Sequence, residues 1–141
     1  IADGTLDLPA SRTKNGRPHQ IHLADQALKI FQNLPRTDGQ NLLFTTNGET
    51  PVSGFSKIKK RLDVASSVTD WRFHDLRRSF ATHSTEKVGI SPVITDKILN
   101  HATGQVRGVA AVYQRGEFLR ERQTALQEWA NFLENTVTDG K

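Results

Sequence analysis

A histidine and an arginine stand three residues apart in the segment Phe73-His74-Asp75-Leu76-Arg77-Arg78-Ser79. On a helix this spacing places both side chains on one face, where an imidazole and a guanidinium can reach the same anionic group. Arginine suits a phosphate because its planar fork matches two oxygens at once. The pair predicts an oxyanion or phosphate site. His74 and Arg77 could also lie on the solvent-exposed face of an ordinary amphipathic helix. The pair alone therefore does not distinguish a phosphate site from an exposed helix surface.

Three further residues along the chain have side chains suited to phosphate chemistry. Lys14 lies in a polar turn segment, His101 follows Leu99-Asn100, and Tyr113 stands in Val112-Tyr113-Gln114-Arg115. Phosphoryl transfer requires an aligned nucleophile, cations around the equatorial oxygens and a proton for the leaving oxygen. A phenol with an ordinary pKa of about 10 is a weak nucleophile at neutral pH and needs a base or a cationic setting.

The order of these residues resembles that of the tyrosine recombinase (phage integrase) family. Lysine on a hairpin, the HxxR pair, a second histidine and a tyrosine follow one another as in that family's catalytic domain. The similarity runs from Thr13 to about Trp129 through TKNGRPHQIHL, FHDLRRSFATH and ILNHATGQVRGVAAVYQR. The resemblance implies site-specific DNA recombination, for integration or excision, through a 3′-phosphotyrosine intermediate and without a metal or other cofactor.

The resemblance also implies a role for each catalytic residue. Tyr113 would attack the scissile phosphodiester, and Arg77 would clamp the phosphate oxygens. His74 would hydrogen-bond the phosphate and help to move the tyrosine proton, and His101 would be a further donor to the phosphate. Lys14 would protonate the 5′-oxygen as it leaves.

One catalytic arginine of the family has no counterpart in this chain. Arg12 stands too close to Lys14 for that role, so we expect the arginine to precede Ile1. The chain has no methionine and opens abruptly on Ile1, which suggests a truncated catalytic domain whose upstream DNA-binding domains are absent. Losing a cation that stabilises a transition state costs on the order of 10² to 10³ in rate. By itself, residues 1–141 should therefore be inactive or very slow.

The pattern of apolar and turn residues predicts the elements that hold these side chains. Thr5–Pro9 and Gln20–Leu23 flank a polar stretch with Asn15-Gly16 at its tip, which is typical of a β-hairpin. Apolar spacing and capping residues predict helices elsewhere, namely over 25–34, from a Ser53 cap through 64, over 73–87, from Ser91-Pro92 through 99, over 108–112 and over 117–135. Leu42–Phe44 fits a brief strand or a turn. One mainly α-helical domain with a small antiparallel hairpin, an α+β catalytic-domain-like fold, is expected.

Basic residues concentrate in the first part of the chain, which suggests double-stranded DNA as the partner. From Ser11 to Arg78 there are twelve Lys and Arg against six Asp and Glu, whereas five acids and two arginines occupy 117–140. A basic body favours a polyanionic partner, although a merely solvated surface would have the same composition. The expected contacts to the DNA backbone come from Arg12, Arg17, Lys57, Lys59, Lys60, Arg61 and Arg78.

The predicted helix 117–135 is the clearest amphipathic segment. Its stripe holds Phe118, Arg122, Leu126, Trp129 and Leu133, and this face must be buried somewhere. The family resemblance suggests docking on a neighbouring protomer in a tetramer on DNA, with a monomer when free. Docking on its own domain is the alternative, and the sequence does not choose between them.

Composition excludes several other classes of function. Absence of cysteine removes disulfides and thiol chemistry, and the five histidines lack the spacing of a metal site. Neither a membrane span nor a signal segment is visible, so a soluble protein is expected. The family resemblance implies a cytoplasmic, nucleoid-associated protein in a bacterial host cell. A non-catalytic DNA-binding or assembly module with the same fold is the competing hypothesis, and a metal-dependent nuclease is a distant third.

Overall fold

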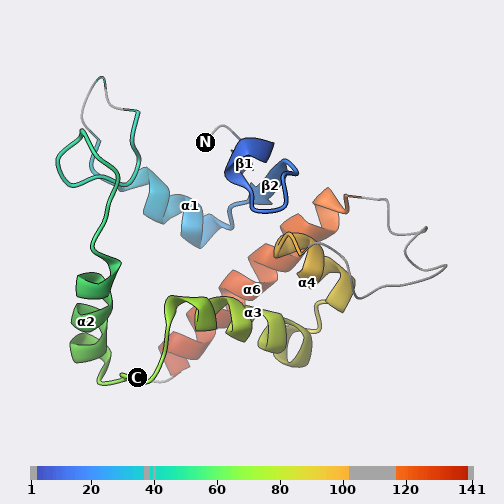
Figure 1. The fold of residues 1–141 in the computed structure, drawn as a ribbon. Helices are drawn as coiled ribbons and strands as arrows, with labels where there is room; N and C mark the ends of the chain where they lie inside the picture. The colour runs from blue at the N-terminus through green and yellow to red at the C-terminus, as the bar shows by residue number, and fades with distance from the viewer. Residues whose placement is uncertain (1–2, 37–38, 40, 102–116, 140–141) are drawn as a thin grey trace.

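A computed structural model of the chain describes residues 3–36, 39, 41–101 and 117–139 (Figure 1). Its elements, in order, are β1 (Thr5–Leu8), the 3-10 turn η1 (Ala10–Arg12), β2 (His19–His22), α1 (Asp25–Gln32), α2 (Phe55–Ser66), α3 (Phe73–Val88), α4 (Pro92–Ile98) and α6 (Leu119–Asp139). The predicted class, mainly helical with a small antiparallel hairpin, is confirmed.

The hairpin forms where the turn chemistry predicts it. Strands β1 and β2 pair antiparallel, with Thr5 opposite His22 and Leu8 opposite His19. The loop between them begins with η1 and then turns at Gly16, whose φ of 66° is the left-handed conformation that glycine adopts without strain. The loop is therefore longer and more structured than a two-residue turn, and it carries Lys14 and Arg17 on its exposed side.

Local signals fix the junction between α3 and α4. Helix α3 ends at Gly89, which has a φ of 81°, and the N–H of Ile90 donates to the carbonyl of Ser84 at 2.9 Å. This is the bonding of a Schellman cap. Ser91 then caps α4, accepting a hydrogen bond from the N–H of Ile94, and Pro92 occupies the first helical position. The predicted cap at Ser91 is confirmed.

Other predicted boundaries were wrong by a few residues. The N-cap of α2 is Gly54, with a φ of 74°, instead of Ser53, whose side chain makes no capping bond to the helix. The final helix, predicted over 117–135, begins at Leu119 and continues to Asp139. The Thr136 and Thr138 hydroxyls there donate to carbonyls four residues earlier. Leu42–Phe44 forms bends before an isolated bridge between Thr45 and Pro51.

The core lies where α3, α4 and α6 meet (Figure 1). Its buried apolar residues are Phe80, Ile90, Ile98, Leu99 and Ala125. Trp129 packs edge-on against Phe80, with ring centroids 5.2 Å apart, and so belongs to the core as expected. The buried hydroxyls of Ser84 and Thr95 satisfy one another at 3.0 Å, which removes the cost of placing them between α3 and α4.

Helix α6 docks on its own domain. It packs against β2, α1, α3 and α4, and polar side chains reinforce the junction with α1. The Gln127 side-chain oxygen accepts from the N–H of Asp25 at 3.0 Å, and Gln26 donates to Glu134 at 2.7 Å. Of the two docking modes that the sequence left open, the isolated chain adopts the one within its own domain.

Candidate active site

Three consecutive carbonyl groups at the end of α4 each accept a hydrogen bond from a different part of the chain. Ile98 accepts from the His19 ring at 3.0 Å, Leu99 accepts from the Arg77 guanidinium, and Asn100 accepts from the Asn15 side chain at 3.2 Å. The last carbonyls of a helix have no partner within the helix, so they are available for such bonds. We call this group of three carbonyls the carbonyl hub.

Arg77 reaches the carbonyl hub from the first turns of α3. Its side chain is half-buried, and only its Nη2 atom has an acceptor among the described residues, the Leu99 carbonyl. A guanidinium has five N–H donors. One edge of the group is therefore anchored to the protein, and the remaining donors keep their capacity for a bound anion.

Asn15 ties the hairpin loop to the carbonyl hub. Its Nδ2 atom donates to the carbonyl of Asn100 and, at 2.8 Å, to that residue's side-chain oxygen, while its own oxygen accepts from the N–H of Arg17. Lys14 precedes this anchor and is exposed. The hairpin loop is thus fixed beside the end of α4, while the lysine ammonium remains free to move.

His101 stands directly after the carbonyl hub. Asn100 has a φ of 50°, which turns the chain away from the helix, and the N–H of His101 returns to the Asp96 carbonyl at 3.1 Å. The ring Nδ1 lies 2.9 Å from the Asp96 carboxylate, so Nδ1–H donates to it. The other ring nitrogen is left for a ligand.

His74 lies in the first turn of α3, one turn before Arg77. It is exposed, and within the described part of the chain it makes no hydrogen bond or ion pair. The start of this helix is held by Asp75, whose carboxylate accepts from the N–H of Arg72 at 2.8 Å. That bond is the main cause that lowers the pKa of Asp75, and Arg78 adds to it. His74 is thus available to an anion at a helix N-terminus.

A cavity of about 460 Å³ opens beside the carbonyl hub. Arg17 and Lys97 give it a cationic character, and among the described residues that line it Glu117, at the start of the segment that leads into α6, is the one carboxylate. The described residues that line it are Asn15, Arg17, Pro18, His19, Lys97, Asn100, His101 and Glu117. We call it the hub cavity.

The predicted nucleophile, Tyr113, lies outside the described residues, as does the predicted helix 108–112. The described chain stops at His101 and resumes at Glu117, and both residues line the hub cavity. Of the other predicted catalytic residues, Arg77, His101 and the Lys14 loop meet at the end of α4. His74 joins them only through its place on α3.

Burial of His19 gives folding a dependence on pH. Desolvation is the largest cause that lowers the pKa of His19 below its ordinary 6.5, the bond to Ile98 opposes it, and the Arg122 charge lowers it further. Below about pH 6.5, the unfolded chain binds more protons at His19 than the folded chain does. The free energy of unfolding is therefore highest above this pH and decreases as the pH falls towards the folded pKa of His19.

We expect the free energy of unfolding to decrease between about pH 7 and pH 5, and a His19→Gln variant to lose most of this decrease. Glutamine keeps an N–H donor for Ile98 without a titrating group. Urea denaturation across this pH range measures both proteins. Equal pH slopes for the two would show that His19 is not the titrating group.

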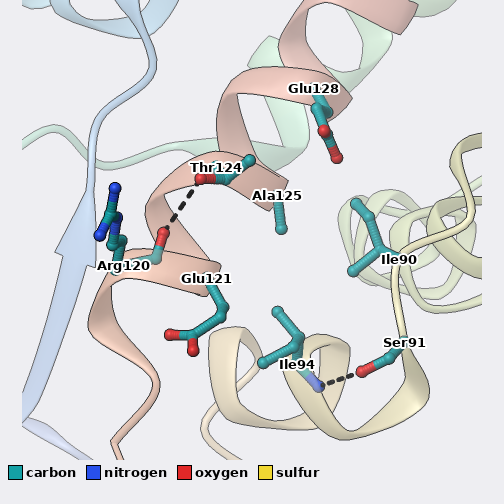
Figure 2. A pocket seen from close by; sticks show the side chains of 8 residues that line it. All are labelled: Ile90, Ser91, Ile94, Arg120, Glu121, Thr124, Ala125 and Glu128. Atoms are coloured by element: carbon teal, nitrogen blue, oxygen red, sulfur yellow. Dashed lines mark hydrogen bonds between the residues drawn. The ribbon is translucent and has the colours of Figure 1, made fainter.

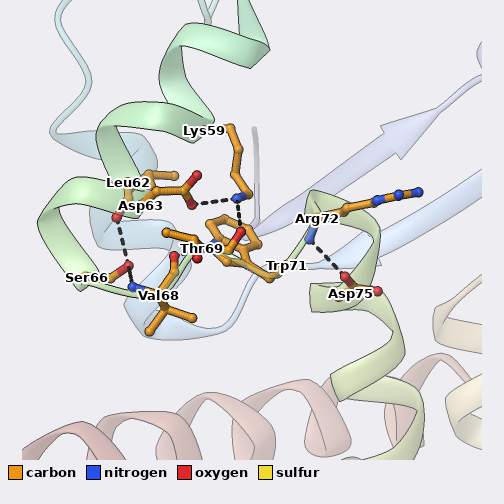
Figure 3. A network of polar contacts seen from close by, with 9 residues as sticks. All are labelled: Lys59, Leu62, Asp63, Ser66, Val68, Thr69, Trp71, Arg72 and Asp75. Carbon is orange, nitrogen blue, oxygen red and sulfur yellow. Dashed lines mark hydrogen bonds and ion pairs between the residues drawn. The ribbon is translucent and has the colours of Figure 1, made fainter.

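The candidates for DNA-backbone contact divide into two groups. Six of the seven are exposed, namely Arg12, Arg17, Lys57, Lys60, Arg61 and Arg78. Lys59 differs, because its ammonium lies 2.5 Å from Asp63, donates to the Thr69 carbonyl and stands 4.5 Å from the centroid of the Trp71 ring (Figure 3). Its side chain is only 18% exposed, so Lys59 holds the loop between α2 and α3.

A second cavity, of about 330 Å³, lies between the start of α4 and α6 (Figure 2). Ile90, Ile94 and Ala125 form its apolar side, and Arg120, Glu121 and Glu128 line its rim. None of the predicted catalytic residues that the structure describes lines this cavity. Among the described residues, no group of three or more His, Asp or Glu is arranged to hold a metal ion. No described helix is long and apolar enough to cross a membrane.

Several residues around the carbonyl hub were missed in the sequence. Asn15 was interpreted only as a turn former, and His19 and Asn100 carried no local signal, because their partners are distant in the chain. Arg122 did carry one: it occupies the apolar stripe of the final helix, where a charge is costly unless it has partners. The structure shows it 4% exposed beside Ala125.

Comparison with known proteins identifies the family of the chain. The model of the phage integrase family matches residues 2–114, which is most of the chain and includes Lys14, Arg77, His101 and Tyr113. The chain therefore belongs to the phage integrase family.

Two curated relatives come from Escherichia coli strain K12. Prophage integrase IntZ is 28% identical over 142 residues, which cover 97% of this chain and 34% of the relative. Prophage integrase IntA is 26% identical over 131 residues, covering 89% of this chain and 30% of the relative. The chain thus spans about a third of the length of these relatives. No solved structure matches it.

Proposed function

We propose that this chain is the catalytic part of a site-specific recombinase that cuts and rejoins double-stranded DNA through a 3′-phosphotyrosine. Tyr113 attacks the scissile phosphorus as its phenol proton passes towards His74, the bond from phosphorus to the 5′-oxygen breaks, and the leaving oxygen takes a proton from Lys14. Rejoining reverses these steps, with a 5′-hydroxyl as nucleophile. The reaction needs no external energy source, because each step replaces one phosphodiester bond by another.

The observation that carries this proposal is the carbonyl hub. Arg77, the Lys14 loop and His101 come from three separate segments and are anchored around the last turn of one short helix. Such anchoring supports catalysis because cations that are already oriented need no reorganisation when charge develops on the phosphate. His74, one turn away on α3, is free to contact the same phosphate.

A nicked duplex that carries the cognate crossover sequence tests the proposal. Cleavage next to the nick releases a short fragment, so the covalent protein-DNA adduct accumulates and can be counted on a denaturing gel. The full-length protein should form the adduct with or without EDTA. Specific DNA binding without any adduct would favour the second candidate, a non-catalytic DNA-binding or assembly module. Retention of Lys14, His74, Arg77, His101 and Tyr113 together speaks against that module.

The exposed basic residues support contacts to DNA phosphates, and α2 offers a matched pair for testing them. Lys60 is exposed, whereas Lys59 is engaged inside the protein. Replacing Lys60 by methionine should weaken DNA binding and reduce the slope of log K against log salt by about one. Replacing Lys59 should leave that slope unchanged and destabilise folding by about 1 kcal/mol.

Filter binding across a salt series and thermal unfolding measure the two effects. A reduced salt slope for the Lys59 variant, with Lys60 indistinguishable from wild type, would contradict the assignment. Both variants remove one positive charge from the same helix, so net charge cannot explain a difference between them.

We also propose that the active assembly is a tetramer on DNA, formed by exchange of the C-terminal helix between protomers. An exchanged α6 would have to restore, from the neighbour, the contacts of Ala125 and Trp129 with the core. The expected upstream arginine belongs to the same proposal, since it would complete the cations around the phosphate in the full-length protein.

A further inference from the structure

Arg122 is a buried cation outside the set of residues assigned to the reaction. Its side chain is 5% exposed, and it lies one turn before the core residue Ala125 on α6. Burial is the main cause that lowers the pKa of its guanidinium, and the Glu117 carboxylate opposes that effect. Burying a charge costs desolvation free energy, which interactions within the fold must offset.

The guanidinium of Arg122 binds two main-chain carbonyls from different segments. Nη2 donates to the carbonyl of Gln20 on β2, and Nη1 donates to the carbonyl of Glu117 at 3.3 Å. The Glu117 carboxylate stands 3.8 Å away and is 70% exposed, so the ion pair is the weaker link. Among the described residues, Nε is buried without a hydrogen-bond partner.

Glu117 lines the hub cavity, and Gln20 is the neighbour in sequence of His19, which also lines it. Gln20 follows His19, whose ring donates to the carbonyl of Ile98. The carbonyl of Leu99, the residue after Ile98, accepts from Arg77. Glu117 lines the hub cavity together with Asn100 and His101. One guanidinium therefore joins β2, which lies beside the carbonyl hub, to Glu117, four residues after Tyr113 in the sequence.

We infer that Arg122 is a positioning residue of the proposed reaction, acting through the main chain of Gln20 and Glu117. It holds one wall of the hub cavity at a set distance from the carbonyl hub that orients Arg77. The inference rests on the proposed function. Arg122 itself does not meet the DNA, because its side chain is enclosed by protein.

The experiment compares Arg122→Met, Arg122→Lys and the control Arg120→Met in the full-length protein. Arg120 is exposed two residues earlier on the same helix, so the control removes the same charge without the buried bonds. Single-turnover adduct formation at saturating nicked DNA gives a rate constant and an amplitude, and titration gives DNA affinity. Loss of folded protein lowers the amplitude alone, whereas misplacement of the site lowers the rate constant.

We expect the rate constant to fall roughly a hundredfold for Arg122→Met and roughly tenfold for Arg122→Lys, which keeps the charge but cannot span both carbonyls. DNA affinity should hold, and Arg120→Met should match wild type. If Arg122→Met fails to fold, Arg122→Lys decides. Wild-type rate constants in the Arg122 variants would overturn the inference and leave the proposed function standing. Absence of any Tyr113-dependent adduct from the wild type would overturn both.

Discussion

Replacing Tyr113 by phenylalanine is expected to abolish the covalent protein-DNA adduct, by roughly 10⁴-fold or more, while DNA affinity changes by less than about a factor of two. The substitution removes only the phenol oxygen, which is the proposed nucleophile, and keeps the ring. Tyr113 is the single tyrosine of this chain, so no other phenol within it can substitute.

Adduct formation on the nicked duplex and binding to an intact duplex measure the two quantities separately. Binding that collapses together with cleavage would mean that the phenol oxygen serves folding or recognition. An adduct that persists in the Tyr113→Phe variant would remove Tyr113 from the chemistry altogether.

Replacing Arg77 by alanine is expected to slow adduct formation at saturating DNA by on the order of 10² to 10³. Two effects combine, since the phosphate loses a cation and the Leu99 carbonyl loses its partner. Arg77→Lys should recover little of the rate. An ammonium cannot hold the Leu99 carbonyl and also present a fork to two phosphate oxygens.

Arg78→Ala is the matched comparison for Arg77. Arg78 is the next residue on α3, its side chain is 76% exposed, and its partner is Asp75 at 3.4 Å. This variant should lower DNA affinity in a salt-dependent manner and leave the rate at saturation close to wild type. Equal losses of rate at Arg77 and Arg78 would show that overall charge matters and the anchored guanidinium does not.

The parts of the fold that depend on local chemistry could be predicted from the sequence. The Asn15-Gly16 turn, the Ser91-Pro92 helix start and the apolar spacing of the final helix each act within a few residues, and the structure contains the elements that they indicate. The sequence did not predict boundaries where neighbouring residues compete for the same cap position. Gly54 is the N-cap of α2, where its φ of 74° lies in the left-handed region that glycine adopts without strain.

The candidate site was predictable in residue type and not in arrangement. Spacing placed His74 and Arg77 on one helix, but the carbonyl that orients Arg77 lies 22 residues further along the chain. His19 and Ile98 are likewise 79 residues apart. Lys59 is a different case, because its place in a basic run predicts a DNA contact, whereas in the structure its ammonium bonds to Asp63 and Thr69.

The carbonyl hub also explains how a domain of this size can orient a charged site. Helix α4 has only seven residues, and the three carbonyls at its C-terminal end serve as acceptors for β2, the hairpin loop and α3. Each of these bonds gives a partner to a carbonyl that would otherwise lack one. The same hydrogen bonds therefore complete the end of α4 and position the site residues.

The most direct test of the central claim is to map the covalent link itself. The adduct formed on the nicked duplex by the full-length protein is digested with a protease and a nuclease, and the modified peptide is sequenced by mass spectrometry. The account predicts a nucleotide joined through its 3′-phosphate to Tyr113. A link to any other residue, or through a 5′-phosphate, would contradict it.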